Sequence, residues 1–192
     1  MIHRLFSQTN QENFSKLFYS QLQKEHDALL AIEHCKKITK GNLWIVGGYI
    51  SACISSALYG TNYHSTNIDV VCEESNIDNT EGQKTFFNHP KIKIGEMTVD
   101  IWPLKELRSI VAGKLAPTIE SYLATVPLTM QSIAWDCYTE SLKGDIGVQA
   151  LSLRQTRINN NPSILFAAER KKWTVEEYAH SKADKINFDV IF

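Results

Sequence analysis

The sequence has 192 residues, of which 43% are hydrophobic and 21% are charged, and its net charge is −1 at pH 7. This composition is typical of a globular domain with a substantial core, and it excludes a collagen-like or fully disordered chain. Because the chain carries no overall positive charge, the composition disfavours a protein that binds long RNA or DNA over a broad surface.

The cysteines and the N-terminal residues indicate where the protein works. Cys35, Cys53, Cys72 and Cys137 are far apart and form no C-x-x-C pair. We therefore expect reduced core thiols and a cytoplasmic location. The histidines are equally dispersed, which disfavours a zinc site. Residues 1–14 are too polar for a signal peptide, and no apolar run approaches the length of a membrane span, so we expect no membrane partner.

The first part of the chain has helical spacing. Between residues 10 and 37, apolar side chains such as Phe14, Phe18 and Leu22 recur at three- and four-residue steps. This spacing predicts one long helix or two shorter ones that pack against a sheet. The pair Gly41–Asn42 is expected to end the helical region.

The stretch from residue 43 to residue 73 organises the rest of the chain. Leu43–Val46 is short and continuously apolar, which predicts a buried strand. The pair Gly47–Gly48 breaks this strand, and the small and apolar residues 49–58 predict a closely packed helix. After a loop, residues 68–72 predict a second strand that carries Asp69 in its middle.

These elements suggest a phosphate site. The N–H groups at a helix N-terminus that opens on two glycines can hold a phosphate, and Ser51 lies in the first turn of this predicted helix. A carboxylate on the neighbouring strand, Asp69, can hold the Mg²⁺ that accompanies a triphosphate. Taken alone, however, the glycine pair also fits a structural turn, and Asp69 also fits an aspartate that caps a loop.

A hairpin is predicted next. Residues 91–95 alternate polar and apolar side chains, Gly95–Glu96 has turn composition, and residues 97–102 return as a partner strand. In such a strand Asp100 points to the face opposite Val99 and Ile101. An acid among apolar neighbours is costly unless it is paired or bound to a metal, so Asp100 is a second candidate site residue.

The remaining residues predict short elements. We expect Lys105, Arg108 and Lys114 to form a solvated helix face, and Asp136 to be a turn or cap residue. A break is expected at Asn159–Pro162. The expected elements are a helix over 103–111, a loop over 113–123, a helix leading into a strand over 128–135, turns over 142–147, a helix and a strand over 148–157, and two helices over 163–192.

At this point the motifs resemble a known family. VGGYISACISSALYG, NIDVV and the later VDI resemble the nucleotidyltransferase superfamily, and in particular the head domain of the poly(A) polymerase and tRNA CCA-adding group. A second likeness lies in PLTMQSIAWD and LKGDIGVQALSLRQTRI, so the resemblance covers residues 43–158. The residues that match are Gly47, Gly48, Leu58, Gly60, Asp69 and Asp100.

The resemblance implies a fold and its division. We expect an α/β (α+β) nucleotidyltransferase-like fold, with a small mixed sheet flanked by helices and a short helical C-terminal appendage. The expected segments are a leading helical segment (1–42), the nucleotidyltransferase-like domain (43–158) and the helical appendage (159–192).

The resemblance also implies a reaction. It predicts transfer of a nucleoside monophosphate from an NTP, expected to be ATP, to a hydroxyl acceptor, with Mg²⁺ as cofactor. Asp69 and Asp100 would be the catalytic and metal-binding acids, with Asn67 as a weaker metal ligand. Gly47, Gly48, Ser51 and Asn67 would bind the nucleotide. The acceptor stays open among a small molecule, a protein side chain and an RNA end, and near-zero charge makes a large RNA the poorest of these.

Several departures support an alternative function. Asn67 stands where the family has the first aspartate of a pair, and it offers only a neutral oxygen to a metal. Ser51 and Ala52 stand where an arginine and an aspartate are expected, and Thr125–Val126 replace another arginine. The alternative is therefore a catalytically inactive relative that binds a nucleotide or a protein partner. A further alternative is an unrelated α/β domain whose glycine pair is only a turn.

Overall fold

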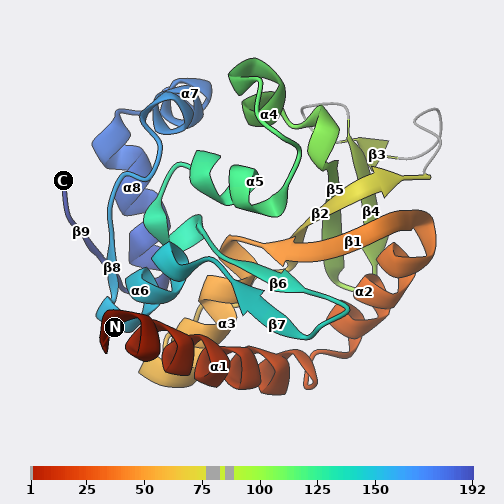
Figure 1. Ribbon diagram of the computed structural model, residues 1–192, viewed down its shortest axis with the longest axis horizontal. Helices are drawn as coiled ribbons and strands as arrows, with labels where there is room; N and C mark the ends of the chain where they lie inside the picture. Colours follow the sequence, from red (N-terminus) through yellow and green to blue (C-terminus); the bar gives the residue numbers. More distant parts are fainter. Residues whose placement is uncertain (1, 77–82, 85–88) are drawn as a thin grey trace.

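A mixed β-sheet forms the centre of the computed structural model, which describes residues 2–76, 83–84 and 89–192. In this part of the chain, seven strands form one sheet in the order β3-β4-β5-β2-β1-β6-β7 (Figure 1). Neighbouring strands are antiparallel except β2 and β5, which are parallel. This arrangement confirms the predicted small mixed sheet. The strands are β1 (Thr39–Val46), β2 (Asn67–Ser75), β3 (Gln83–Lys84), β4 (Pro90–Ile94), β5 (Met97–Pro103), β6 (Ala134–Asp136) and β7 (Ser141–Lys143).

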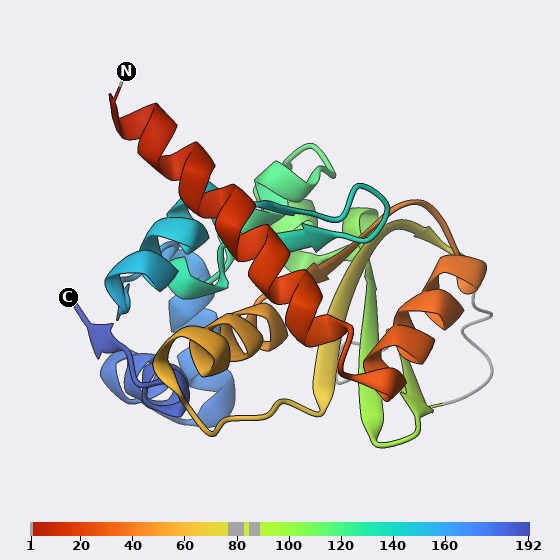
Figure 2. The ribbon, with the colours of Figure 1, turned by 90° about the horizontal axis from the view of Figure 1, so that it is seen from below.

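Three helices cover one face of the sheet. They are α1 (Ile2–Leu22), α2 (His26–Ile38) and α3 (Gly48–Tyr59), and Figure 2 views the molecule from their side. The first two confirm the alternative of two shorter helices. The predicted helix end at Gly41–Asn42 is wrong, because α2 stops at Ile38 and strand β1 begins at once. Gly41 has a φ of +74° inside β1, where the register with β2 shifts, so this glycine serves a bulge.

The main core lies between these helices and the sheet. Phe18 of α1 is fully buried, and its ring centroid lies 6.1 Å from that of Tyr49 and 5.0 Å from that of Trp135. Alternate residues of the central strands, including Ile68 and Val99, point into the same core. The period of two along each strand therefore sends the intervening side chains, among them Asp69 and Asp100, to the other face.

Shorter elements cover that other face. A 3₁₀ turn, η1 (Leu104–Glu106), is followed by α4 (Arg108–Gly113) and α5 (Ile119–Thr125). The single helix expected over 103–111 is thus divided at Leu107, which has extended backbone angles. The loop expected over 113–123 is also wrong, because α5 starts within it and Thr118 caps this helix by accepting a hydrogen bond from the Ser121 N–H.

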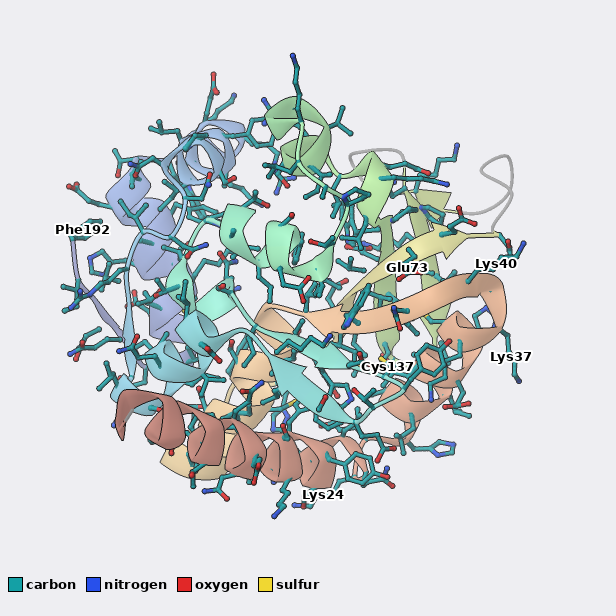
Figure 3. All side chains as sticks on the ribbon, viewed as in Figure 1. Lys24, Lys37, Lys40, Glu73, Cys137 and Phe192 are labelled. Atoms are coloured by element: carbon teal, nitrogen blue, oxygen red, sulfur yellow. The ribbon has the colours of Figure 1, made fainter. Side chains whose placement is uncertain are left out.

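The last part of the chain completes the molecule. The turn predicted over 142–147 is largely replaced by the end of β7 and the start of α6, which Gly144 joins with a φ of +104°. The two predicted C-terminal helices are confirmed as α7 and α8. Figure 3 shows Phe192 at the end of the molecule opposite Lys37 and Lys40. The elements are η2 (Thr129–Gln131), α6 (Asp145–Leu153), β8 (Gln155–Thr156), α7 (Asn161–Lys171), α8 (Val175–Ala183), η3 (Asp184–Ile186) and β9 (Asp189–Val190), which pairs with β8.

Two further predictions concern thiols and membranes. All four cysteines are free, and Cys35, Cys72 and Cys137 are buried, as expected of reduced core residues. Burial raises the pKa of the Cys35 thiol to about 12, so this side chain behaves as a small apolar residue. None of the helices in the described ranges is long and apolar enough to cross a membrane.

Candidate active site

The two candidate acids lie side by side on the sheet. Strands β2 and β5 run parallel, and their register places Asp69 directly opposite Asp100. Both side chains lie on the face opposite the main core, since Ile68, Val70 and Val99 point into that core. The pairing of β2 and β5 therefore brings together two carboxylates that are separated by thirty residues in the sequence.

The glycine turn lies at the end of the adjacent strand. The last residue of β1, Val46, pairs with Asp69, so Gly47 and Gly48 continue alongside the start of β2. Gly47 has a φ of +67°, and its N–H donates to the carbonyl oxygen of Ile133 at 3.2 Å. Gly47 thus turns the chain, a conformation that favours glycine. Gly48 is exposed and begins α3, and a methyl group added at either glycine would meet no atom within 4 Å. Open space therefore lies before this helix N-terminus.

The other two predicted nucleotide contacts are placed differently. Ser51 is only 2% exposed, and its hydroxyl donates to the carbonyl oxygen of Met130 at 2.9 Å. This hydroxyl therefore links α3 to η2. Asn67 begins β2 and is half-buried, and alternation along the strand puts it on the same face as Asp69. Its backbone, not its side chain, makes the turn contacts with Ser65, whose hydroxyl donates to the Asn67 carbonyl at 2.9 Å.

Asp69 sits in a strongly perturbed environment. Burial raises the pKa of its carboxyl group to about 6, and the negative charge of Asp100 adds to the increase. A hydrogen bond from the Trp102 side chain and the positive charges of Lys182 and Lys91 act in the opposite direction. Two carboxylates held this close repel each other, and such a pair is stabilised by a cation. Perturbed acids in a cleft are typical of functional sites.

Asp100 has a lysine neighbour and an unused oxygen. The Nζ atom of Lys91 on β4 lies 3.5 Å from Oδ1 of Asp100. Although this oxygen is buried, no hydrogen bond from a described group reaches it. The lysine thus contributes charge without a well-directed hydrogen bond. A buried carboxylate oxygen with spare lone pairs is a suitable ligand for a hard cation.

The residues fit a divalent ion only in part. Asp69 and Asp100 offer carboxylates from adjacent strands, and Asn67 offers a neutral oxygen on the same face. Within the described ranges, however, no group of three or more His, Cys, Asp or Glu side chains is positioned to hold a metal ion. These residues alone therefore supply two carboxylates and one neutral oxygen, and a divalent ion here would need further oxygen ligands from outside them.

The carboxylate pair opens into a large cavity of about 880 Å³. Residues of strands β2, β4 and β5 and of helices α4, α5, α7 and α8 line this cavity. Tyr122 and Tyr178 lie close enough to Asp69 for its charge to raise both phenol pKa values, although burial is the larger cause. The volume lies in the range of small-ligand sites. The residues that line it do not include the glycine turn.

Arg108 is a cavity residue that the sequence did not reveal. We predicted a solvated helix face for Lys105, Arg108 and Lys114. All three residues are exposed, as predicted. In addition, the guanidinium carbon of Arg108 lies 3.6 Å from the centre of the Phe166 ring, and both residues line the cavity. This cation–π contact joins α4 to α7 across 57 intervening residues, a link that local spacing cannot show.

Comparisons with known proteins identify the fold. No protein-family model matches the sequence, and no curated protein matches it. Solved structures do match. A tRNA nucleotidyltransferase complexed with a primer tRNA and an incoming ATP analog has a TM-score of 0.52 and 16% identity over 78% of this chain and 43% of that one. The Thermotoga maritima CCA-adding enzyme complexed with tRNA has a TM-score of 0.51 and 18% identity over 79% of this chain and 35% of that one.

These similarities define the class of fold. A third structure, of a tRNA-processing enzyme complex, has a TM-score of 0.52 and 18% identity over 78% of this chain and 40% of that one. The chain thus has a nucleotidyltransferase head-domain-like fold, which confirms the fold expected from the glycine turn and the aspartates. The chain spans about two fifths of the length of these enzymes.

Proposed function

We propose that this protein is a small nucleotidyltransferase-like enzyme. It moves a nucleoside monophosphate from an NTP, with ATP as the expected donor, to a hydroxyl group, and it uses Mg²⁺. One observation carries the proposal: Asp69 and Asp100 face each other across a parallel strand pair, at the edge of a cavity of about 880 Å³, in a fold of this class. The free, buried thiols support a cytoplasmic location.

The proposed reaction is a substitution at phosphorus. The acceptor oxygen forms a bond to the α-phosphorus, the bond from that phosphorus to the bridging oxygen breaks, and pyrophosphate leaves. The hydroxyl proton passes to water. When bound, the divalent ion would neutralise phosphate oxygens and make the acceptor hydroxyl more acidic.

The residues of this chain would divide the work by chemistry. Asp69 and Asp100 hold the ion, and the Asn67 side chain supplies a neutral oxygen beside them. Gly48 is an exposed residue at the N-terminus of α3, and its N–H would bind a phosphate oxygen. Lys91 and Lys182 place positive charge near the carboxylates, which favours a triphosphate over a neutral ligand.

The acceptor is proposed as a hydroxyl of a small molecule, a protein side chain or an RNA end. Two of the similar structures contain tRNA, but this chain spans about two fifths of those enzymes. A short acceptor therefore suits the chain better than a whole tRNA, and a net charge of −1 agrees with this choice.

The test is Mg²⁺-dependent release of pyrophosphate with each NTP and a mixed acceptor pool. Activity is expected in the wild-type protein and lost in Asp69→Ala and Asp100→Ala. Asp189→Ala is the matched control, because this aspartate is exposed and lies outside the cavity. Equal activity in all three variants would refute the assignment of the carboxylate pair.

A second candidate is a catalytically inactive relative that binds a nucleotide or a protein partner. The observation that favours it is the number of acids in the site. Three carboxylates would hold two ions, whereas this site has two carboxylates, and Asn67 stands at the third position. Tight binding of a nucleotide without turnover, abolished by Asp100→Ala, would select this function over the enzyme.

A further inference from the structure

A lysine side chain is built into the carboxylate pair. Lys91 of β4 stands directly opposite Asp100 in the antiparallel register with β5, and its Nζ lies 3.5 Å from Asp100 Oδ1. The backbone pairing of two strands fixes this position, so the contact does not depend on a flexible loop. The positive charge of Lys91 also acts to lower the pKa of Asp69. Both side chains line the cavity, together with Lys91 itself.

The charges of the described site do not suit two divalent ions. Two carboxylates contribute two negative charges, and Asn67 contributes none. The ammonium group of Lys91, 3.5 Å from Asp100 Oδ1, already neutralises part of this charge. A second divalent ion would lack its own carboxylate and would face the ammonium group at close range.

We propose that Lys91 takes the place of one cation, so that the site holds a single divalent ion between Asp69 and Asp100. This inference rests on the proposed function, and it specifies how the site manages without a third acid. The ammonium group supplies permanent positive charge at the position of the missing ion. It also weakens the binding of the remaining ion, because like charges repel.

The test compares Lys91→Met with Lys93→Met. Lys93 lies two residues further along the same strand, opposite Thr98, and it is exposed and outside the cavity. Mn²⁺ is the probe, and its binding is followed by electron paramagnetic resonance with and without equimolar α,β-methylene-ATP. The melting temperature of each variant, measured without metal, checks that it is folded.

The wild-type protein and Lys93→Met are expected to give the spectrum of one isolated Mn²⁺ ion. Lys91→Met is expected to bind Mn²⁺ about tenfold more tightly or better, since a positive charge a few ångströms from the ion is removed. With the nucleotide analogue it is also expected to admit a second ion, which is recognised by spin coupling between two close ions.

Four results would overturn the inference. A spin-coupled pair in the wild-type protein would show that two ions bind beside Lys91, and the proposed enzymatic function would then stand without it. Equal Mn²⁺ affinity in both variants, or tighter binding with no second ion in Lys91→Met, would remove the role of this lysine. Absence of Mn²⁺ binding in every protein would refute the metal site and the inference together.

Discussion

Replacing Gly47 by alanine is expected to destabilise the protein, whereas the same change at Gly48 is not. Gly47 has φ of 67° and ψ of −125°, a backbone conformation that side chains disfavour. Such a residue costs about 1–3 kcal/mol. Steric collision adds nothing, because the new methyl group would meet no atom within 4 Å at either position. The comparison therefore isolates backbone strain.

The expected magnitude is about 2 kcal/mol for Gly47→Ala. In a chain of this length that loss lowers the melting temperature by roughly 4–8 °C. Gly48 is the first residue of α3, where alanine favours the helix, so Gly48→Ala is expected to be neutral or stabilising by up to about 1 kcal/mol. Urea denaturation and calorimetry of both variants would measure the difference. Equal losses in the two variants would refute the assignment of the strain to Gly47.

The same variants examine the proposed phosphate contact. In Gly48→Ala the methyl group enters the open space before α3, so nucleotide binding is expected to weaken in a protein that remains stable. Titration calorimetry with ATP and Mg²⁺ would measure the affinity. Wild-type affinity in Gly48→Ala would refute the proposed contact between Gly48 and the phosphate.

Three other predictions concern stability. In EDTA, the free energy of unfolding of the wild-type protein is expected to fall by up to about 3 kcal/mol as pH rises from about 4 to about 6. The reason is that folding raises the pKa of Asp69 from 3.8 to about 6 and so favours the protonated acid. Urea titrations of Asp69→Asn across this range should lack that dependence on pH. Phe18→Ala should cost about 3–5 kcal/mol in urea denaturation, since its ring is fully buried, and a loss below about 1 kcal/mol would contradict this packing. Ser51→Ala should cost about 1–2 kcal/mol by calorimetry, because the Met130 carbonyl loses its buried donor, and an unchanged melting temperature would count against that bond.

The sequence predicted the central elements because their signals are local. An apolar run, a glycine turn and a period of two along the strand suffice to place β1, α3, β2 and the hairpin of β4 and β5. The same period put Asp100 on the face opposite Val99, as the structure shows. The family likeness then brought Asp69 and Asp100 together, since no local pattern shows that β2 and β5 are neighbours.

The elements that were wrong depend on contacts between distant residues. Gly41 has the composition of a helix stop, but pairing with β2 makes it a strand bulge. The prediction that Arg108 is exposed is confirmed, but local spacing could not show that the Phe166 ring of α7 lies against it. The metal and nucleotide roles of the site residues, and the division of the chain at residues 42 and 158, remain predictions. Residues 77–82 and 85–88, within the polar segment after β2, lie outside the described residues.

The cavity wall that faces the carboxylates has a consequence for how the protein matures. Asp69 and Asp100 come from the middle of the chain, whereas Phe166 and Tyr178 come from α7 and α8. Both helices follow the sheet residues in the sequence, so they are synthesised after Asp69 and Asp100. Because residues of α7 and α8 line the cavity, it is complete only after both helices have been synthesised and have packed.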